Sequence, residues 1–288
     1  MTPGHGLASL IVQGKDRPGI VAAVASVLSR HDANIVSLDQ YSDNPHGGAF
    51  FQRTVFGRDG LAAALPAIGD DLGSALADGF ELDFSLRDLS VPKRVAIFAS
   101  RSDHCLLDLL WRNRRGELPV TVSMVISNHA TSATEVRSFG IPFFHVPSAG
   151  ADKPAAEAEH LRLLRGNVDF IVLARYMQIL SPSFLAQAGV PIINIHHSFL
   201  PAFIGAAPYA KAKERGVKLI GATAHYVTDD LDEGPIIEQD VVRVTHADTV
   251  GDLQRRGADV ERMVLARAVR WHSEDRVIRN GNHTIVFA

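Results

Sequence analysis

Two histidines stand side by side at the end of a short apolar run, in the stretch NIHHSFLPAFIG that begins at Asn194. The run IINIH is typical of a strand buried on both faces. Strand alternation then places Asn194 and His196 on one face and Ile195 on the other. An amide donor beside a proton carrier suits acid–base chemistry at a carbonyl group. We expect His197 to point to the other side of the strand and to be structural.

A second candidate segment, GATAHYVTDDLDEGPIIEQ, begins at Gly221. It predicts a strand that carries His225, followed by an acidic loop that Gly234 and Pro235 close. The loop holds Asp229, Asp230, Asp232 and Glu233. A carboxylate from such a loop can orient an imidazole at a neighbouring strand end, as in other acid–base sites.

A zinc site is an alternative for these histidines. His196, His197, His225 and an aspartate are acceptable zinc ligands. Adjacent residues of a strand point apart, however, and the usual short ligand spacings are absent from the sequence. We therefore expect no metal. The single cysteine, Cys105, lies among the leucines of a predicted helix, where we expect it to pack.

The elements that would position these residues begin near residue 93. Compact apolar runs predict strands buried on both faces, with helices between several of them: RVAIFAS, TVSMVIS, PFFHVP, VDFIVLAR and IINIH. This rhythm predicts a Rossmann-like α/β domain with a mostly parallel sheet. A long periodic helix over residues 250–271 and a hairpin that turns at Asn280 and Gly281 follow. Ligands of open α/β sheets bind beyond the carboxyl ends of the strands, where Asn194 and His196 are expected.

The first ~85 residues show a different pattern. Strands and helices follow one another in the order βαββαβ, which predicts a ferredoxin-like α/β domain. Pro66 falls inside the second predicted helix and marks either its start or a kink. Residues 87–92 carry charge and a proline, as linkers often do. We therefore predict a domain over 1–86, a linker over 87–92 and a second domain over 93–288.

Composition narrows the functional classes. Hydrophobic residues make up 46% of the chain, charged residues 21%, and the net charge is −3, as in an ordinary soluble protein. We expect no nucleic-acid partner, because no basic stripe is present, and no membrane span, because no apolar run reaches ~18 residues. The first ten residues lack the pattern of a secretory signal, and one cysteine fits a reducing compartment, so we expect a cytoplasmic protein.

The candidate motifs resemble the formyltransferase family over roughly residues 92–240. The resemblance rests on the Asn-x-His and Ser-x-Leu-Pro pattern from Asn194 to Pro201 and on the downstream Asp232-x-Gly234. It implies that Asn194 and His196 stabilise an oxyanion or move a proton, and that Asp232 holds His196 or the attacking water. It also implies a folate site, lined by Met177, Gln178, Ile179, Leu180, His225, Thr228, Asp229, Asp230 and Leu231.

The N-terminal part resembles the ACT domain, a small regulatory module that often binds amino acids. The resemblance rests on a first loop with its helix start and on the entry to the second strand: Asp16, Arg17, Pro18, Gly19, Ile20 and Asn34. It implies an amino-acid effector, with glycine and methionine as candidates. It also implies a homo-oligomer, because ACT modules usually pair.

The two parts together, and the motif DHCLLDLL that begins at Asp103 in the second part, resemble the formyltetrahydrofolate deformylase family. That family hydrolyses the formamide C–N bond of 10-formyltetrahydrofolate, which supplies formate for purine synthesis and balances one-carbon pools. The resemblance implies a folate substrate and water as partners, and no tightly bound cofactor.

The loop after the first strand of the second domain indicates which molecule accepts the formyl group. Formyltransferases that use a phosphorylated amine carry a loop with glycine and asparagine there, whose N–H groups hold the phosphate. Here the stretch is ASRSDH, residues 99–104, which has no glycine and adds the carboxylate of Asp103. Arg101 could contact an anion, which weakens the argument against a phosphate. The loop nevertheless favours water as the acceptor of the formyl group.

Two other functions stay open as alternatives. One is formyl transfer to an amine, which would use the same three catalytic residues. The other is a sensor without catalysis that binds folate and an amino acid. One local departure also stands out, because Ala207 lies where the resemblance implies a larger polar or basic residue.

Overall fold

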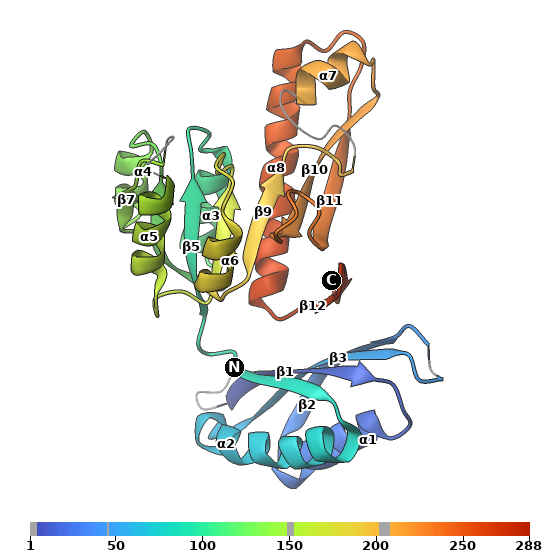
Figure 1. The fold of residues 1–288 in the computed structure, drawn as a ribbon. Helices are drawn as coiled ribbons and strands as arrows, with labels where there is room; N and C mark the ends of the chain where they lie inside the picture. The colour runs from blue at the N-terminus through green and yellow to red at the C-terminus, as the bar shows by residue number, and fades with distance from the viewer. Residues whose placement is uncertain (1–4, 45, 149–152, 202–207) are drawn as a thin grey trace. The chain divides into compact units, whose positions relative to one another are not determined.

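The structure, a computed structural model, describes residues 5–44, 46–148, 153–201 and 208–288. Ala207, where the sequence departs from its resemblance, lies outside these residues. The chain divides into two units (Figure 1). One contains the residues up to Pro92 together with Glu274–Ile278 and Ile285–Ala288, and the other contains Lys93–Ser273 and Arg279–Thr284.

The first unit has the predicted order of elements. These are β1 (His5–Lys15), α1 (Ile20–Arg30), β2 (Asn34–Ser42), β3 (Ala49–Asp59), α2 (Leu61–Leu72), the π-helical turn η1 (Gly73–Asp78) and β4 (Asp83–Asp88). The strands form an antiparallel sheet in the order β2-β3-β1-β4. Figure 1 shows α1 and α2 on the same face of this sheet. The ferredoxin-like prediction is confirmed, and Pro66 lies within α2 rather than at its start.

The core of this unit explains why α1 forms where it does. Its apolar residues recur at helical spacing, and Ile20, Val24, Val27 and Leu28 are all buried in one cluster with residues of the sheet and of α2. Gly19 precedes the helix with φ of 101°, in the left-handed region that glycine tolerates best.

The second unit is a larger α/β domain. Its elements begin with β5 (Lys93–Ala99), α3 (His104–Arg114), β6 (Val120–Ser127), α4 (Ala133–Ser138), β7 (Phe143–His145), α5 (Lys153–Leu164), β8 (Phe170–Ala174) and α6 (Pro182–Ala188). Then follow β9 (Ile192–His196), α7 (Pro208–Glu214), β10 (Leu219–Tyr226), β11 (Ile236–Arg243) and α8 (Val250–Ser273). The predicted C-terminal hairpin is present as β12 (Val277–Asn280) and β13 (His283–Val286).

Seven strands form one sheet in the order β11-β10-β9-β8-β5-β6-β7. The five strands from β9 to β7 in that order are parallel, whereas β10 and β11 run antiparallel to their neighbours. The mostly parallel sheet is therefore confirmed. The sequence did not predict β11, because this edge strand is partly exposed and carries several polar residues instead of a continuous apolar run.

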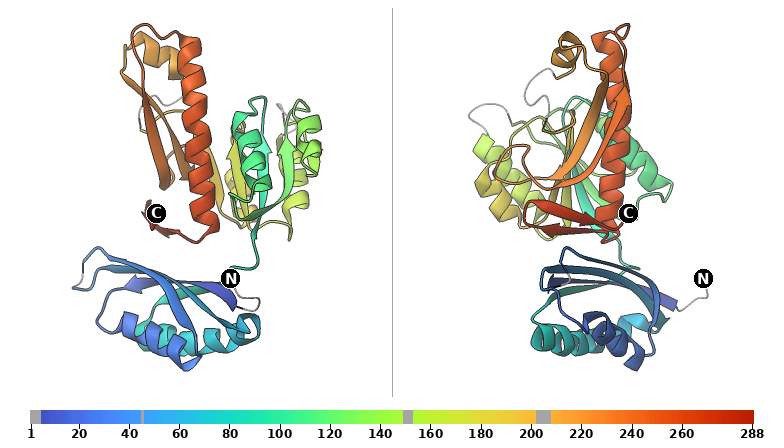
Figure 2. Two further views of the ribbon diagram at one scale, coloured as in Figure 1. Left: turned by 180° about the vertical axis from the view of Figure 1, so that it is seen from behind. Right: turned by 90° about the vertical axis from the view of Figure 1, so that its right-hand side faces the viewer.

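Helices cover both faces of this sheet. Ala96 and Phe98 of β5 share a buried cluster with residues of α5 and α6, which places those helices on one face. Phe170 of β8 packs against His272 of α8, with ring centroids 4.7 Å apart, on the other face. Figure 2 shows α8 running beside β10 and β11, with α3 close to it. Within the described residues, no helix is both long enough and apolar enough to cross a membrane.

Candidate active site

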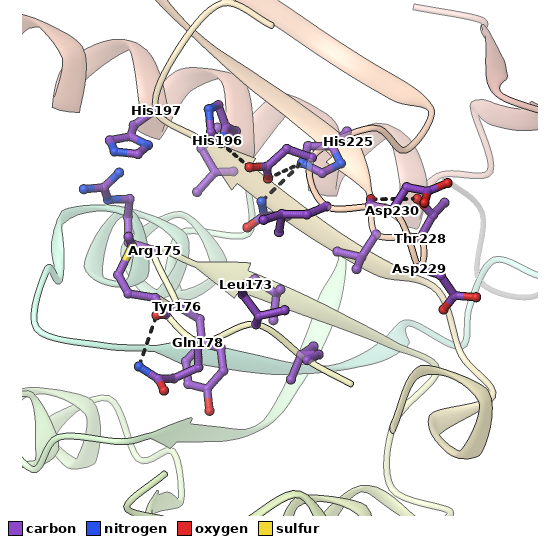
Figure 3. Close-up of a pocket in the computed structure, with 18 residues that line it drawn as sticks. Leu173, Arg175, Tyr176, Gln178, His196, His197, His225, Thr228, Asp229 and Asp230 are labelled. Carbon is purple, nitrogen blue, oxygen red and sulfur yellow. Dashed lines mark hydrogen bonds and ion pairs between the residues drawn. The ribbon is translucent and has the colours of Figure 1, made fainter. Parts of the chain in front are cut away.

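A cavity of about 450 Å³ opens at the carboxyl ends of β8 and β9, beside the loop that follows β10 (Figure 3). This is the edge at which open α/β sheets bind ligands. The structure brings together at this cavity all twelve residues that the sequence proposed for catalysis and substrate binding. They are Met177, Gln178, Ile179, Leu180, Asn194, His196, His225, Thr228, Asp229, Asp230, Leu231 and Asp232.

Asn194 and His225 meet because their strands are antiparallel neighbours. His225 stands directly opposite Asn194 in the register of β9 and β10, so the two side chains share a face. His225 Nδ1–H donates to the carbonyl of Tyr226 at 3.0 Å, which leaves Nε2 to accept from Asn194 Nδ2 at 3.2 Å. One N–H of Asn194 is thereby used, and the other can serve an oxygen in the cavity.

Asp232 links the two histidines. Its Oδ2 lies 3.2 Å from His196 Nδ1, and its Oδ1 lies 3.6 Å from His225 Nε2. The pKa of this carboxyl is held well below its ordinary value by the hydrogen bond from His196, and burial opposes this without cancelling it. Asp232 is therefore a carboxylate throughout the physiological pH range.

The loop after β10 needs an unusual backbone to deliver Asp232. Asp232 has φ of 59°, in the left-handed region that non-glycine residues rarely adopt. Two residues on, a Cβ on Gly234 would lie 1.7 Å from the carbonyl oxygen of Tyr226, so only glycine fits there. The Tyr226 N–H donates to the carbonyl of Pro235 at 2.9 Å and closes the loop. The Asp-x-Gly spacing thus reflects a tight return of the chain.

His196 lines the cavity, and Asp232 holds its ring. Its Nδ1 faces Asp232, and its Nε2 is buried without a hydrogen-bond partner among the described residues. A carboxylate that accepts from Nδ1–H fixes the tautomer in which Nε2 carries a lone pair. A nitrogen with a lone pair is the one that can accept a proton and return it.

The segment Met177–Leu180 forms an apolar wall that other elements hold in place. Ser100 Oγ accepts from the Met177 N–H at 3.0 Å, and Glu157 accepts from the Ser181 N–H at 2.9 Å. Met177 and Ile179 nevertheless leave 58% and 62% of their surface exposed. Large apolar side chains exposed at a cavity rim mark a place where a flat, partly apolar ligand can bind.

His197 is where the expectation about strand faces is wrong. Its ring also lines the cavity, 5.2 Å from the ring of His196 and 6.1 Å from that of Tyr209. The strand ends at His196, so alternation no longer decides where the next side chain points. Burial, with the nearby charge of Arg175 as a smaller cause, lowers the pKa of His197 to about 4, and the ring is neutral at pH 7.

The residues singled out in the N-terminal unit lie together around the start of α1, apart from Asn34. Asp16 accepts a hydrogen bond from Ser42 Oγ, and Arg17 pairs with Glu81 at 2.9 Å. Pro18 precedes Gly19, the N-cap of α1, and Ile20 is buried at the helix start. Asn34 is the first residue of β2.

Three residues that shape the site were not among the predicted site residues. Arg175 lines the cavity, and it belongs to a segment, residues 173–181, that resembles the folate-binding segment of the formyltransferase family. Nothing in a single sequence shows that Ser100 holds Met177. Thr223 stands opposite His196 in β10, and its hydroxyl accepts from the Leu200 N–H at 3.0 Å and donates to the carbonyl of Ser198. Only the antiparallel register reveals that it anchors the loop after β9.

Comparison with known families accounts for most of the chain. The formyl transferase family matches residues 93–269, and the ACT domain family matches residues 8–73. The fold and the site therefore define a formyltransferase-fold enzyme that carries an N-terminal ACT domain.

Individual relatives narrow this class. Formyltetrahydrofolate deformylase of Mycobacterium tuberculosis is 62% identical over 281 residues, which is 98% of this chain and 91% of that protein. The crystal structure of a formyltetrahydrofolate deformylase from Pseudomonas syringae superposes with a TM-score of 0.94 at 46% identity, over all of this chain and 96% of that one. A glycinamide ribonucleotide transformylase from Symbiobacterium toebii gives a TM-score of 0.64 at 35% identity, over 68% of this chain and 95% of that one. This chain belongs to the formyltetrahydrofolate deformylase family.

Proposed function

We propose that this chain hydrolyses 10-formyltetrahydrofolate to formate and tetrahydrofolate. The observation that carries the proposal is the set Asn194, His196 and Asp232 at one cavity, in a chain that resembles deformylases along its whole length. The formate released supplies purine synthesis and helps to balance the one-carbon pools of the cell.

The roles of the three residues follow from their hydrogen bonds. Neutral His196 takes a proton from water through Nε2, while Asp232 stabilises the imidazolium that forms. Water oxygen bonds to the formyl carbon, and the remaining N–H of Asn194 donates to the resulting oxyanion. One such donor contributes ~3 kcal/mol to the transition state.

The tetrahedral intermediate then breaks down to the two products. The bond between the formyl carbon and N10 of the folate breaks, and His196 returns its proton to the departing nitrogen. Formic acid then loses a proton and leaves as formate. No oxidant, reductant or second substrate is needed.

The folate is proposed to lie against the wall Met177–Leu180. The opposite wall is the loop Thr228–Leu231, in which the Thr228 hydroxyl donates to the carbonyl of Asp230 at 3.2 Å. Carboxylates of Asp229 and Asp230 and backbone groups of this loop offer acceptors for the amino groups of a pterin ring.

A formate assay tests the proposal. Purified protein is supplied with 10-formyltetrahydrofolate and no amine, and formate and tetrahydrofolate are both measured. Equal amounts of the two products are expected. Turnover that requires an added amine would favour the formyltransferase alternative, and binding without any turnover would favour the sensor.

The structure offers less support for those alternatives. The transformylase from Symbiobacterium toebii corresponds to 68% of this chain, whereas the deformylase from Pseudomonas syringae corresponds to all of it. In the loop between β5 and α3, Ser100 is committed to Asn128 and Met177 rather than available to a phosphate.

We propose that no tightly bound metal or cofactor takes part. Among the described residues, the three side chains His104, Cys105 and Glu261 form the one group gathered closely enough to ligate an ion. Burial raises the pKa of the Cys105 thiol well above its ordinary value, and the carboxylate of Glu261 already pairs with Arg175. A thiol and a neighbouring cation both disfavour a metal there. Activity is expected to survive dialysis against a chelator.

The domain roles are also part of the proposal. Residues 1–86 would regulate, 87–92 would link, and 93–288 would catalyse in the cytoplasm. An amino-acid effector is proposed at the loop that contains Asp16, Arg17 and Gly19. Formate release measured with glycine, methionine and a panel of other amino acids tests this, and an unchanged rate with all of them would remove the regulatory role.

A homo-oligomer is proposed to form through β2. This strand lies at an edge of its sheet, and Val36, Leu38 and Tyr41 leave 60%, 38% and 46% of their surface exposed. Open strand edges with apolar side chains favour pairing with another chain. Light scattering should report an oligomer for the natural chain and a smaller species for Val36→Glu.

A further inference from the structure

Arg175 is a buried cation at the cavity that the proposed reaction does not use. It lies just beyond β8 with φ of 60°, a backbone conformation that costs energy in a residue other than glycine. Only 15% of its side chain is exposed, yet it lines the cavity. Figure 3 shows its guanidinium beside the ring of His197, with His196 next along the same wall.

A network of buried polar groups fixes this cation. Glu261 is 2% exposed, and its Oε2 lies 3.5 Å from Arg175 Nε and 2.8 Å from His104 Nε2. Its Oε1 accepts from the Tyr209 hydroxyl at 2.7 Å. We call these four residues (His104, Arg175, Tyr209 and Glu261) the Glu261 cluster. Because Glu261 lies on the Nε side, the terminal nitrogens of the guanidinium are not taken up by this ion pair.

The charges around the cavity make this cation distinctive. In the described part of the chain, Arg175 is the one lysine or arginine among the lining residues, and the other charged groups are carboxylates. His197 adds no charge at pH 7. An anion inside the cavity would therefore be repelled by the carboxylates and attracted at Arg175 alone.

We infer that Arg175 forms a subsite for a small carboxylate, and that its occupant is the formate produced by the proposed hydrolysis. Formate arises where His196 and Asn194 act, and it carries a negative charge at pH 7. The planar fork of a guanidinium matches the two oxygens of a carboxylate in a bidentate pair. This inference rests on the proposed function, because it identifies where that reaction leaves its anionic product.

The glutamate tail of a folate offers the same carboxylate chemistry. The position of Arg175 next to His197, at the end of the cavity that contains His196, favours formate over the tail. The two sources make different predictions, so one set of variants can separate them.

The test uses the full-length chain with three changes. Arg175→Met removes the cation, Arg175→Lys keeps the charge but loses the fork, and Arg175→Met combined with Glu261→Gln avoids leaving a buried carboxylate unpaired. Arg115→Met serves as control, because Arg115 pairs with Glu117 on an exposed surface. Binding of carbon-13 formate is followed by NMR line width, and inhibition of turnover by added formate is measured alongside.

Formate should bind the natural chain and Arg115→Met equally. Its affinity should fall about tenfold or more in Arg175→Met and in the double variant, as expected for the loss of a charge-assisted hydrogen bond, and by less in Arg175→Lys. Equal formate affinity in all variants, or no formate binding by the natural chain, would overturn the inference.

A second experiment tells whether Arg175 binds formate or the glutamate tail of the folate. The Michaelis constant for the complete folate substrate and that for its analogue without glutamate should respond alike to Arg175→Met. A Michaelis constant that rises only for the complete folate, with formate affinity unchanged, would assign Arg175 to the tail instead. Formate binding needs no turnover, so a chain that binds formate but releases none from the folate would refute the proposed function and not this subsite.

Discussion

Two carboxylates in the second unit, Asp232 and Glu261, each hold a histidine, and they differ in whether that histidine lies at the cavity. In the Asp232 cluster (Asn194, His196, His225 and Asp232), His196 lines the cavity, and its Nε2 is buried without a partner among the described residues. In the Glu261 cluster, the carboxylate is 2% exposed and its oxygens serve His104, Arg175 and Tyr209, and His104 is not among the described residues that line the cavity.

The two clusters differ in role: the Asp232 cluster is proposed to catalyse, and the Glu261 cluster to stabilise the fold. A histidine–carboxylate pair is not by itself a sign of catalysis, because both clusters contain one. A histidine that lines the ligand cavity distinguishes the Asp232 cluster, whereas the Glu261 carboxylate hydrogen-bonds His104 of α3 and Tyr209 of α7 and forms an ion pair with Arg175. Changes in the first should therefore affect turnover, and changes in the second mainly stability.

The largest effect is expected from Asp232→Asn. The amide cannot stabilise an imidazolium, so kcat/KM should fall by roughly 10³–10⁴-fold while the fold remains intact. Glu233→Gln, the same change at the next, exposed residue, is the control and should stay close to the natural rate. Steady-state formate release measures both. Comparable rates for the two variants would remove Asp232 from the mechanism.

Gly234→Ala tests the loop that delivers Asp232. The new Cβ would collide with the Tyr226 carbonyl, and that carbonyl also fixes His225. A displaced catalytic group costs on the order of 10²-fold in rate, and the strain should lower the free energy of unfolding by ~1–3 kcal/mol. Gly251→Ala, where the nearest atom would be 3.7 Å away, is the matched control and should change neither quantity appreciably.

Glu261→Ala tests whether a change in the Glu261 cluster affects stability more than turnover. It leaves Arg175 buried without its partner, so the free energy of unfolding should drop by ~3–5 kcal/mol. Glu261→Gln keeps the shape and a hydrogen-bond acceptor and should lose less. In denaturant titrations the Ala variant should unfold first, and at temperatures where both variants remain folded their turnover should fall far less than that of Asp232→Asn. A loss of turnover as large as that of Asp232→Asn would contradict the division between the clusters.

The smallest effect concerns a histidine that belongs to neither cluster. His160 packs against Phe98 and Phe184, and burial lowers its pKa to about 4. The unfolded chain, with a histidine pKa near ~6.5, binds more protons between these values, so His160 makes stability fall as the pH drops from ~6.5 towards 4, by up to ~3 kcal/mol. In His160→Phe the unfolding midpoint should change less between pH 7 and pH 5.

The control for that change is His283→Phe, at an exposed position. Its unfolding midpoint should keep the pH dependence of the natural chain. Identical pH dependence in His160→Phe would show that this histidine is not protonated on unfolding in the way its burial implies.

The sequence predicted those features that depend on local pattern. The order βαββαβ, the buried parallel strands and the alternation of Asn194 and His196 all arise within short segments. The strand β10 was predicted, but its antiparallel pairing with β9 was not, and β11 was missed. The pairing of Asn194 with His225 and of Thr223 with His196 was missed for the same reason, because the sequence of one strand does not determine its register with another.

The position of His197 shows a second limit. Alternation predicts a side chain only while the strand continues, and β9 ends one residue earlier. The Glu261 cluster shows a third, since its members come from four segments between residues 104 and 261, and a single sequence gives no sign that they meet.

The most direct test of hydrolysis at this site follows one turnover in water labelled with oxygen-18. The natural chain, in excess over 10-formyltetrahydrofolate, should release formate that carries one labelled oxygen and an equal amount of tetrahydrofolate. His196→Ala should still bind the folate but release formate at least ~10³-fold more slowly, because the proposed mechanism assigns removal of the proton from water to His196. Formate release by His196→Ala at the rate of the natural chain, or formate without the label, would contradict hydrolysis by this site.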